Sequence, residues 1–444
     1  MGEKRLSDEL SRYGYVFSVK KTGVLYLIAF SGLLGLGRLF SLHLYEQISL
    51  CIIGLFFFPF FLRNSLKNQY YQKRFSDLNL YMEQFIYSFL KTGKILATLE
   101  DLSLVFEKEE IKEKIEEAKE YILHTYDEED VEKKALKIIE DEYENYILSL
   151  IHRFCLQAES LGGEYSSTLQ ILLESRRIWT DRIYENQQIR KKKRMDILIS
   201  VAVSILICLL IYMISYRMKL GIENHPVAQV ITVIVLGLDF FIFYKADVQL
   251  SFGYSEEKKD EEIYVDYYRY LKETTPKSPW QKLKYHTYKK VVTQELEKAF
   301  SRWLMVVSLL LQSENVQVAI YRSYDDAPLI LKPALKDLIS SLRENPDGIE
   351  PYVSFLEEFT LPEVHSAMKM LYSVSEGYGG NYEHQIAEIL DRNQRMLHRS
   401  EQLKTEDSLA GLYGLFLAPQ ITAGVKMVVD LVLVMAVYFT KGFA

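Results

Sequence analysis

Long apolar blocks are the feature that most limits how this chain can fold. Residues Ile197–Tyr216 include no charged side chain, and a helix of about 20 apolar residues is long enough to cross the hydrocarbon core of a bilayer. Backbone polar groups inside a bilayer must be satisfied within the protein, which favours helices. The chain is therefore predicted to be an all-α, polytopic membrane protein. About five transmembrane helices are expected: Val24–Phe40, Ile48–Leu62, Ile197–Tyr216, Val227–Tyr244 and one within Leu409–Phe439.

The second block is the shortest and contains Pro59 near its end. Proline removes a backbone donor and disturbs a helix interior. Ile48–Leu62 is therefore predicted either as a full span or as half of a tight hairpin with the first block.

Lysine and arginine flank the blocks unevenly. Lys20 and Lys21 precede the first block and a basic run precedes the third, whereas the loop 217–226 carries only Arg217 and Lys219. Loops rich in Lys and Arg stay in the cytoplasm. This predicts a multi-pass protein of the inner (plasma) membrane, with the N-terminus and both large polar regions cytoplasmic and the C-terminus outside.

The polar regions show helical periodicity, with apolar residues recurring every three or four positions and a break at Gly93. Each is predicted to form a cytoplasmic helical bundle. The expected domains are an N-terminal membrane hairpin (1–65), a first bundle (66–195), a transmembrane hairpin (196–245), a linker with a second bundle (246–405) and a C-terminal transmembrane segment (406–444).

A short motif occurs twice, each time ahead of an apolar block. Residues 158–165 read AESLGGEY and residues 375–382 read SEGYGGNY, and an offset of 217 (380 − 163) aligns them. The match predicts two related bundles. Glycine closes helices in the left-handed conformation, so the motif predicts a structural corner formed by Gly162, Gly163, Gly379 and Gly380. The acidic residues Glu159 and Glu376 are predicted to neutralise a helix N-terminus, to pair with a basic residue or to contact a partner, with a structural carboxylate favoured.

Two such cytoplasmic bundles, each leading into a span, resemble the type II secretion system protein F family. The N-terminal membrane hairpin, the doubled glycine and the segment Leu172–Trp179 look most like its Tad/Flp pilus branch, although Ala158 and Ser375 stand where the family more often has glycine. The resemblance implies an inner-membrane platform of a type IV or Tad-type pilus, or of a type II secretion-like assembly. Its implied partners are a cytoplasmic hexameric secretion ATPase, pilin or pseudopilin subunits, and a second platform subunit or another copy of itself.

The sequence lacks the common catalytic motifs. The nearest approach to a phosphate-binding loop, Lys91–Lys94, lacks the upstream glycine and the hydroxyl after the lysine. No zinc or nucleophile motif is present, and His152, His365, His384 and His398 lack ligand spacing. We expect no enzyme activity, no cofactor and no metal. Basic residues gather beside the apolar blocks, so nucleic-acid binding is not expected, and the three cysteines are expected to be reduced packing residues.

Two charged features stand out as candidate sites. The first is a basic patch that sets topology and attracts anionic lipid, or docks the ATPase: Arg176, Arg177, Arg182, Arg190, Lys191, Lys192, Lys193 and Arg194. The second is Lys426 with Asp430, four apart on one face of the last apolar block. This pair is predicted either to form an intramembrane interface or to lie where the span begins, with Lys426 at the cytoplasmic surface. Asp239 is a weaker case of the same kind.

Two other function classes remain open. A secondary transporter would need a path lined by charges in broken helices, for which Asp239, Lys426 and Asp430 are the candidates. A membrane-anchored sensor would need a large external domain, which the short external loops do not supply.

Overall fold

The computed structural model describes residues 19–106, 110–125, 130–162, 166–219, 221–251, 261–311, 314–377 and 411–442, together with isolated residues between 388 and 399. In these ranges the regular elements are helices, without strands. The chain divides into two compact units. The first, here called the membrane unit, comprises Met1–Asn79, Trp179–Tyr254 and Asp407–Ala444, and the second, the helical unit, comprises Leu80–Ile178 and Ser255–Glu406.

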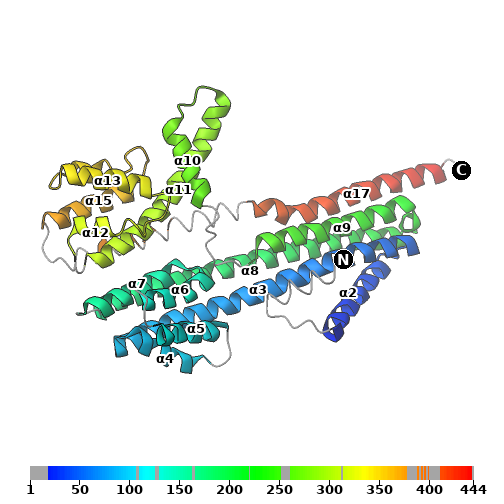
Figure 1. Ribbon diagram of the computed structural model, residues 1–444. Coiled ribbons are helices and arrows are strands. Elements are labelled where there is room, and N and C mark those ends of the chain that lie inside the picture. The colour runs from blue at the N-terminus through cyan, green and yellow to red at the C-terminus, as the bar shows by residue number, and fades with distance from the viewer. Residues whose placement is uncertain are drawn as a thin grey trace. The chain divides into compact units, whose positions relative to one another are not determined.

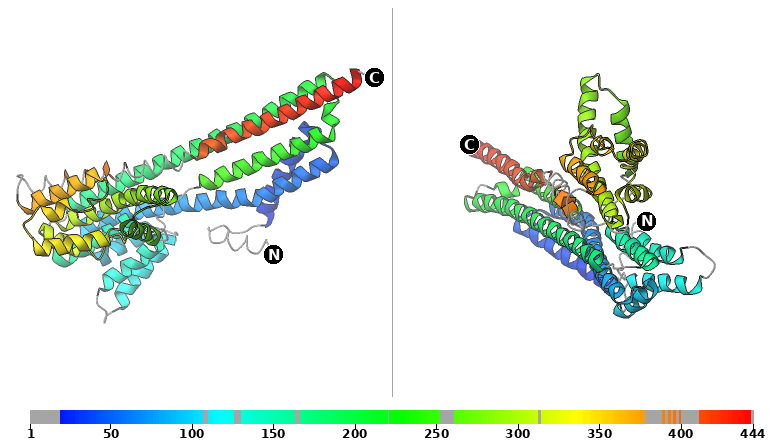
Figure 2. Two further views of the ribbon diagram at one scale, coloured as in Figure 1. Left: turned by 90° about the horizontal axis from the view of Figure 1, so that it is seen from above. Right: turned by 90° about the vertical axis from the view of Figure 1, so that its left-hand side faces the viewer.

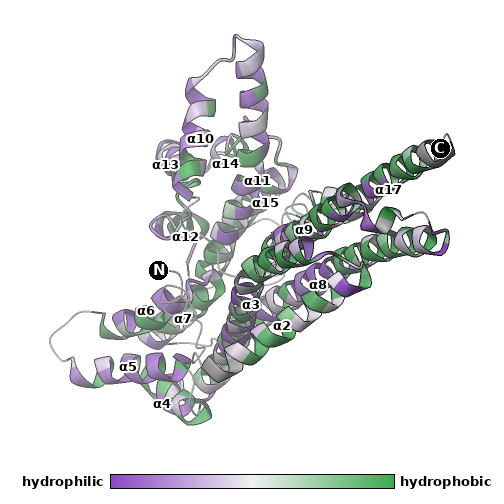
Figure 3. Ribbon diagram, turned by 90° about the vertical axis from the view of Figure 1, so that its right-hand side faces the viewer, coloured by the Kyte–Doolittle hydropathy of each residue, from purple (hydrophilic) through white to green (hydrophobic). Residues whose placement is uncertain are grey.

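Five helices of the described residues are long and apolar enough to cross a membrane, which confirms the predicted set. They are α2 (Val19–Leu39), α3 (Leu44–Thr92), α8 (Ser166–Arg217), α9 (Pro226–Gln249) and α17 (Leu412–Gly442), shown in Figure 1. Hydropathy colouring shows α9 and α17 as mainly apolar ribbons, in contrast to the polar helices α5 and α6 (Figure 3).

Helices α3 and α8 extend well beyond their apolar blocks. The predicted short second span is the beginning of the 49-residue α3, which continues through Pro59. Helix α8 has 52 residues and ends with the third apolar block. Each helix therefore belongs partly to the membrane unit and partly to the helical unit, which the predicted domain limits did not anticipate.

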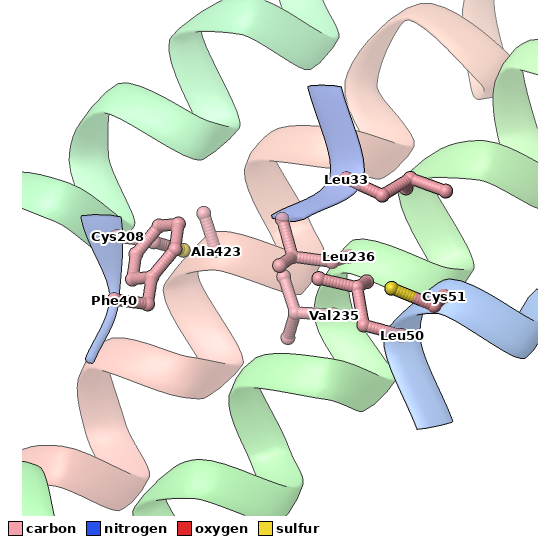
Figure 4. Packing of buried hydrophobic residues seen from close by; sticks show 8 residues of the cluster. All are labelled: Leu33, Phe40, Leu50, Cys51, Cys208, Val235, Leu236 and Ala423. Carbon is pink, nitrogen blue, oxygen red and sulfur yellow. The ribbon is translucent and has the colours of Figure 1, made fainter. Parts of the chain in front are cut away.

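The membrane unit is held together by a cluster that draws one or two residues from each of its helices. Figure 4 shows Leu33, Phe40, Leu50, Cys51, Cys208, Val235, Leu236 and Ala423 in this cluster. Close approach of α2 and α3 depends on Gly54, because a Cβ there would lie 2.5 Å from the Leu33 side chain. Helices α9 and α17 pack side by side (Figures 1 and 2). The short 3₁₀ helix η1 (Ile222–Asn224) precedes α9.

The first part of the helical unit contains α4 (Ile95–Val105), α5 (Glu110–His124), α6 (Val131–Tyr143) and α7 (Tyr146–Leu161). The predicted break at Gly93 is confirmed, since this residue separates α3 from α4 with φ +64°. Fully buried Phe85, Phe89 and Leu99 form part of the core. The thiol of Cys155 is also buried and free, as are those of the other two cysteines, which confirms their predicted packing role.

The second part contains α10 (Glu261–Glu273), α11 (Pro279–Leu310), α12 (Val316–Arg322), α13 (Lys332–Glu344), α14 (Glu350–Val353) and α15 (Pro362–Ser375). Its core surrounds Trp303, whose indole N–H donates to Ser323 Oγ over 2.7 Å. The two parts meet where Arg153 pairs with Asp326 at 2.7 Å. They form one compact unit, so the division into two related bundles stays a prediction.

Candidate functional site

The most unusual feature of the membrane unit is an ion pair buried near the middle of α17. Lys426 Nζ donates to Asp430 Oδ2, and the two side chains are only 4% and 10% exposed. Lys426 lies near the middle of the apolar helix range Leu412–Val437, and its ammonium group is buried within the bundle. The position of the pair relative to a bilayer stays a prediction. Charges buried among apolar groups are costly unless they are paired, and pairing within one helix offsets part of that cost.

Asp239 of α9 connects that helix to α8 and to α17. Ser204 Oγ of α8 donates to Asp239 Oδ2 over 2.9 Å, and Thr422 Oγ1 of α17 donates to Oδ1 over 3.2 Å. Asp239 is only 2% exposed. Since Thr422 and Lys426 are four residues apart, the Asp239 cluster and the ion pair occupy neighbouring turns of one face of α17. Together they form a polar strip, here called the intramembrane polar strip, inside an otherwise apolar bundle.

A cavity of about 260 Å³ lies beside this strip. Lys426 and Asp430 form part of its wall, and most of the remaining lining is apolar, with Tyr212, Ser215, Gln229 and Thr232 as polar exceptions. Within the described chain, Asp430 Oδ1 is buried without a hydrogen-bond partner. A carboxylate oxygen buried without a donor is costly, which adds to the cost of placing this pair inside an apolar bundle.

A second charged arrangement lies at the end of α9. Arg194 Nη2 is 2.5 Å from Asp247 Oδ1, and Asn64 Nδ2 donates to the backbone oxygen of Asp247 over 2.9 Å. Asp247 is 1% exposed. Arg190 also donates to the Ser251 backbone oxygen over 2.8 Å. These contacts join α3, α8 and α9 where their apolar parts end.

The predicted basic patch is thus divided by the structure. Arg190 and Arg194 are engaged with the end of α9, and Lys193 lies over the Tyr413 ring at 5.0 Å. Lys191 and Lys192 are exposed.

The remaining members of the patch lie earlier on α8. Arg176 is buried and pairs with Glu83 at 3.4 Å, whereas exposed Arg177 lies 3.9 Å from Glu174. Arg182 is half-buried. Only Arg177, Lys191 and Lys192 of the predicted patch present largely exposed side chains.

The first glycine corner has a clear structural role. Gly162 ends α7 with φ +70°. One turn earlier, Glu159 Oε2 accepts from the Ile95 backbone N–H over 2.9 Å, and its Oε1 lies 3.4 Å from Lys94 Nζ. Lys94 is the N-cap of α4 and provides no side-chain cap. Glu159 therefore supplies the acceptor that the N-terminus of α4 needs.

The second corner differs where it is described. Helix α15 ends at Ser375, and Gly377 takes the left-handed conformation with φ +69°. This glycine is two residues before Gly379, the position that the offset of 217 aligns with Gly162. Half-buried Glu376 lies close enough to Tyr352 for its charge to add to burial in raising the pKa of that phenol. Gly163, Gly379 and Gly380 lie outside the described residues.

A buried polar triad crosses the first part of the helical unit. His152 is fully buried; its Nδ1 lies 2.9 Å from Glu140 Oε1 and its Nε2 lies 3.0 Å from the Tyr81 hydroxyl. An ionised carboxylate only accepts, so Nδ1 carries the proton. Burial acts most strongly on Glu140 and raises its pKa, but the hydrogen bond and charge interaction with His152 outweigh it and leave that pKa below its ordinary value. The triad lies within the core, consistent with the structural role predicted for His152.

No group of three His, Cys, Asp or Glu side chains suited to a metal ion occurs among the residues that the structure describes. Sequence reasoning missed Asn64, Ser204, Asp247 and Thr422. Asp247 carried one available signal, because it lies eight residues after Asp239 and therefore on the same helix face.

Comparison with known proteins gave no family model, curated protein or solved structure that matches this chain.

Proposed function

We propose that this chain is an inner-membrane platform protein of a type IV or Tad-type pilus, or of a type II secretion-like assembly. It couples a cytoplasmic hexameric secretion ATPase to the assembly of pilin or pseudopilin subunits, and it acts through protein contacts without a cofactor. Its N-terminus and helical unit face the cytoplasm and its C-terminus faces out. The proposal rests on the resemblance of the repeated glycine corners to the protein F family and on the distribution of Lys and Arg.

One structural observation carries the mechanical part of this proposal. Helices α3 and α8 pass from the membrane unit into the helical unit without a break, at Asn79–Leu80 and at Ile178–Trp179. A continuous α-helix keeps its backbone hydrogen bonds along its whole length. A displacement of the helical unit is therefore transmitted to membrane helices along two rods rather than absorbed in a loop.

The contacts inside the membrane unit support the same view. Asp239 connects α8, α9 and α17, and Asp247 connects α3, α8 and α9. A movement that enters through α3 and α8 thereby reaches α9 and α17.

Helix-breaking variants test this coupling. Glu185 of α8 and Gln72 of α3 are exposed, so Glu185→Pro and Gln72→Pro interrupt the helices without removing a packed side chain, at a local cost of about 3 kcal/mol. Both variants should still co-purify with the secretion ATPase in mild detergent but should lose pilus assembly. Glu185→Ala and Gln72→Ala should assemble normally, and the purified wild-type protein should hydrolyse no ATP alone.

Two results would count against the proposal. One is failure of the wild-type protein to co-purify with any secretion ATPase, and the other is normal assembly by both proline variants. Genes for a secretion ATPase and small prepilins beside this gene would support it.

A secondary transporter is the second candidate, because a cavity lies next to a buried ion pair in the membrane unit. Transport requires a path that opens to each side in turn. Liposomes containing the purified protein should then take up a solute, and uptake should be abolished in a Lys426→Met, Asp430→Leu double variant. A platform protein shows no uptake in either form.

A further inference from the structure

Helix α10 and the beginning of α11 form a hairpin that extends from the rest of the helical unit (Figures 1 and 2). Aromatic contacts hold the two helical segments of this hairpin together. Tyr267 stacks on Tyr288 with ring centroids 4.0 Å apart, and Lys284 lies over the Tyr270 and Tyr288 rings at 5.1 and 5.2 Å. We call residues 261–290 the arm and residues 274–290 its tip.

The second half of α10 packs against the body of the helical unit. Tyr268 stacks against Phe359 with centroids 5.8 Å apart, and Lys272 lies 3.6 Å from Asp337. These contacts hold the last turns of α10, next to the tip, in a fixed position.

The tip, in contrast, exposes apolar side chains. Trp280 is 81% exposed and Leu283, one turn later on α11, is 62% exposed. Tryptophan carries a large apolar surface, and its exposure beside another apolar residue marks an interaction surface.

The tip is also strongly basic. Its seventeen residues contain five lysines and no aspartate or glutamate: Lys277, Lys282, Lys284, Lys289 and Lys290. The four acidic residues of the arm all lie on α10, at positions 261, 262, 266 and 273. Positive charge is thus concentrated around the exposed Trp280, and a partner for this surface must be both anionic and able to accept an indole ring.

We propose that the tip of the arm binds the surface of an anionic lipid bilayer, with Trp280 and Leu283 in the headgroup region and the lysines against lipid phosphates. Tryptophan and lysine are the residues that anchor proteins at membrane interfaces. This inference rests on the proposed membrane topology: eleven residues, 250–260, separate the end of the apolar helix α9 from the beginning of α10, and eleven residues span at most roughly 40 Å. An acidic protein surface is the competing occupant, and the test below separates it from lipid.

The test uses the full-length protein in lipid nanodiscs. Subtracting the fluorescence of the Trp280→Phe variant from that of the wild type isolates the emission of Trp280 from that of Trp179 and Trp303. In discs that contain phosphatidylglycerol, brominated lipid should quench this difference signal, and high salt should relieve the quenching by screening. In phosphatidylcholine discs the quenching should be much weaker.

Lysine variants supply the matched comparison. Lys277→Gln with Lys282→Gln, both exposed and outside the aromatic contacts of the arm, should weaken the partitioning of the tip by roughly 25-fold, since each lysine near an anionic surface contributes about fivefold. Lys133→Gln with Lys137→Gln, on the exposed face of α6, should change nothing, and circular dichroism checks that all variants keep their helices.

Two outcomes would overturn the inference. One is equal quenching in anionic and zwitterionic discs. The other is a Trp280 signal that brominated lipid never quenches and that changes only when an acidic protein is added, which would identify the tip as a protein-docking surface.

Discussion

Removing Lys426 and Asp430 singly and together separates the cost of burying charge from any functional role of the pair. Lys426→Met and Asp430→Leu each leave one buried charge without its partner, whereas the double variant replaces both charges by apolar groups of similar volume. The side chains are 4% and 10% exposed, so water compensates little for a missing partner.

The expected magnitudes follow from this burial. Breaking a buried pair by removing one partner costs about 3–5 kcal/mol, while replacing the whole pair by apolar residues is often neutral or stabilising. The single variants should therefore lose about 3–5 kcal/mol, and the double variant should differ from the wild type by less than about 1 kcal/mol. In a double-mutant cycle of these variants, the coupling energy between Lys426 and Asp430 is then large, and the effects of the two single changes do not add.

Denaturation of the purified protein in mixed micelles, followed by loss of helix signal, measures these free energies. If both single variants lose less than about 1 kcal/mol, the pair is not buried in the folded protein and the structural reasoning is wrong. A double variant that is stable but cannot support assembly assigns the pair a role in function, because stability no longer explains the loss.

Three further predictions concern other parts of the chain. Glu159→Ala should cost the helical unit about 1 kcal/mol in urea denaturation, because the N-terminus of α4 loses its acceptor. Gly54→Ala should destabilise the α2–α3 hairpin in thermal unfolding, since its Cβ would clash, whereas Gly35→Ala on α2 meets no atom within 4 Å and should be neutral or stabilising. The pKa of Glu140 is lowered in the folded state, because the interaction with His152 outweighs burial. The ionised carboxylate therefore stabilises the fold above the unfolded pKa of about 4.3, and this stabilisation is lost as pH falls through the folded pKa. The difference in unfolding free energy between the wild type and Glu140→Gln should shrink over the same pH range.

The five apolar helices could be predicted because hydropathy alone decides whether a segment fits a bilayer. The length of α3 was harder to predict because Pro59 suggested an end. In the structure the helix continues through that residue, and no glycine occurs between Pro59 and the break at Gly93. The change from apolar to polar composition after Leu62 marks a change of environment, not a change of backbone conformation.

The candidate site was also only partly predictable from the sequence. Lys426 and Asp430 could be paired from the sequence because a spacing of four places them on one helix face. The partners of Asp239 come from α8 and α17, 35 residues before it and 183 after it. Nothing in a single sequence marks a serine and a threonine in two other helices as donors to one carboxylate, so these contacts emerge only when the helices are packed.

The two corner motifs match in sequence, but their described residues differ in backbone geometry and in contacts. Glu159 accepts from the N-terminus of α4. The offset of 217 aligns α12 with residues 99–105 of α4, but α12 has its own cap, because Asn315 accepts from the Val318 backbone N–H over 2.9 Å. Glu376 is therefore not needed at that helix end. Of the two acidic residues of the motif, Glu376 is the better candidate for a partner contact.

The buried carboxylates of the membrane unit suggest how it responds to force. Asp239 accepts from neutral hydroxyls, Asp247 pairs with Arg194, and Asp430 pairs with Lys426 on its own helix. The first two connect different helices, so sliding one helix past another would expose an unpaired carboxylate to an apolar environment at a cost of several kcal/mol. The Lys426–Asp430 pair moves with α17 and carries no such penalty. On the same face of α17, however, Thr422 donates to Asp239 of α9, so α17 as a whole cannot slide past α9 without breaking that contact, whereas a rearrangement confined to the cavity beside Lys426 and Asp430 leaves both contacts intact.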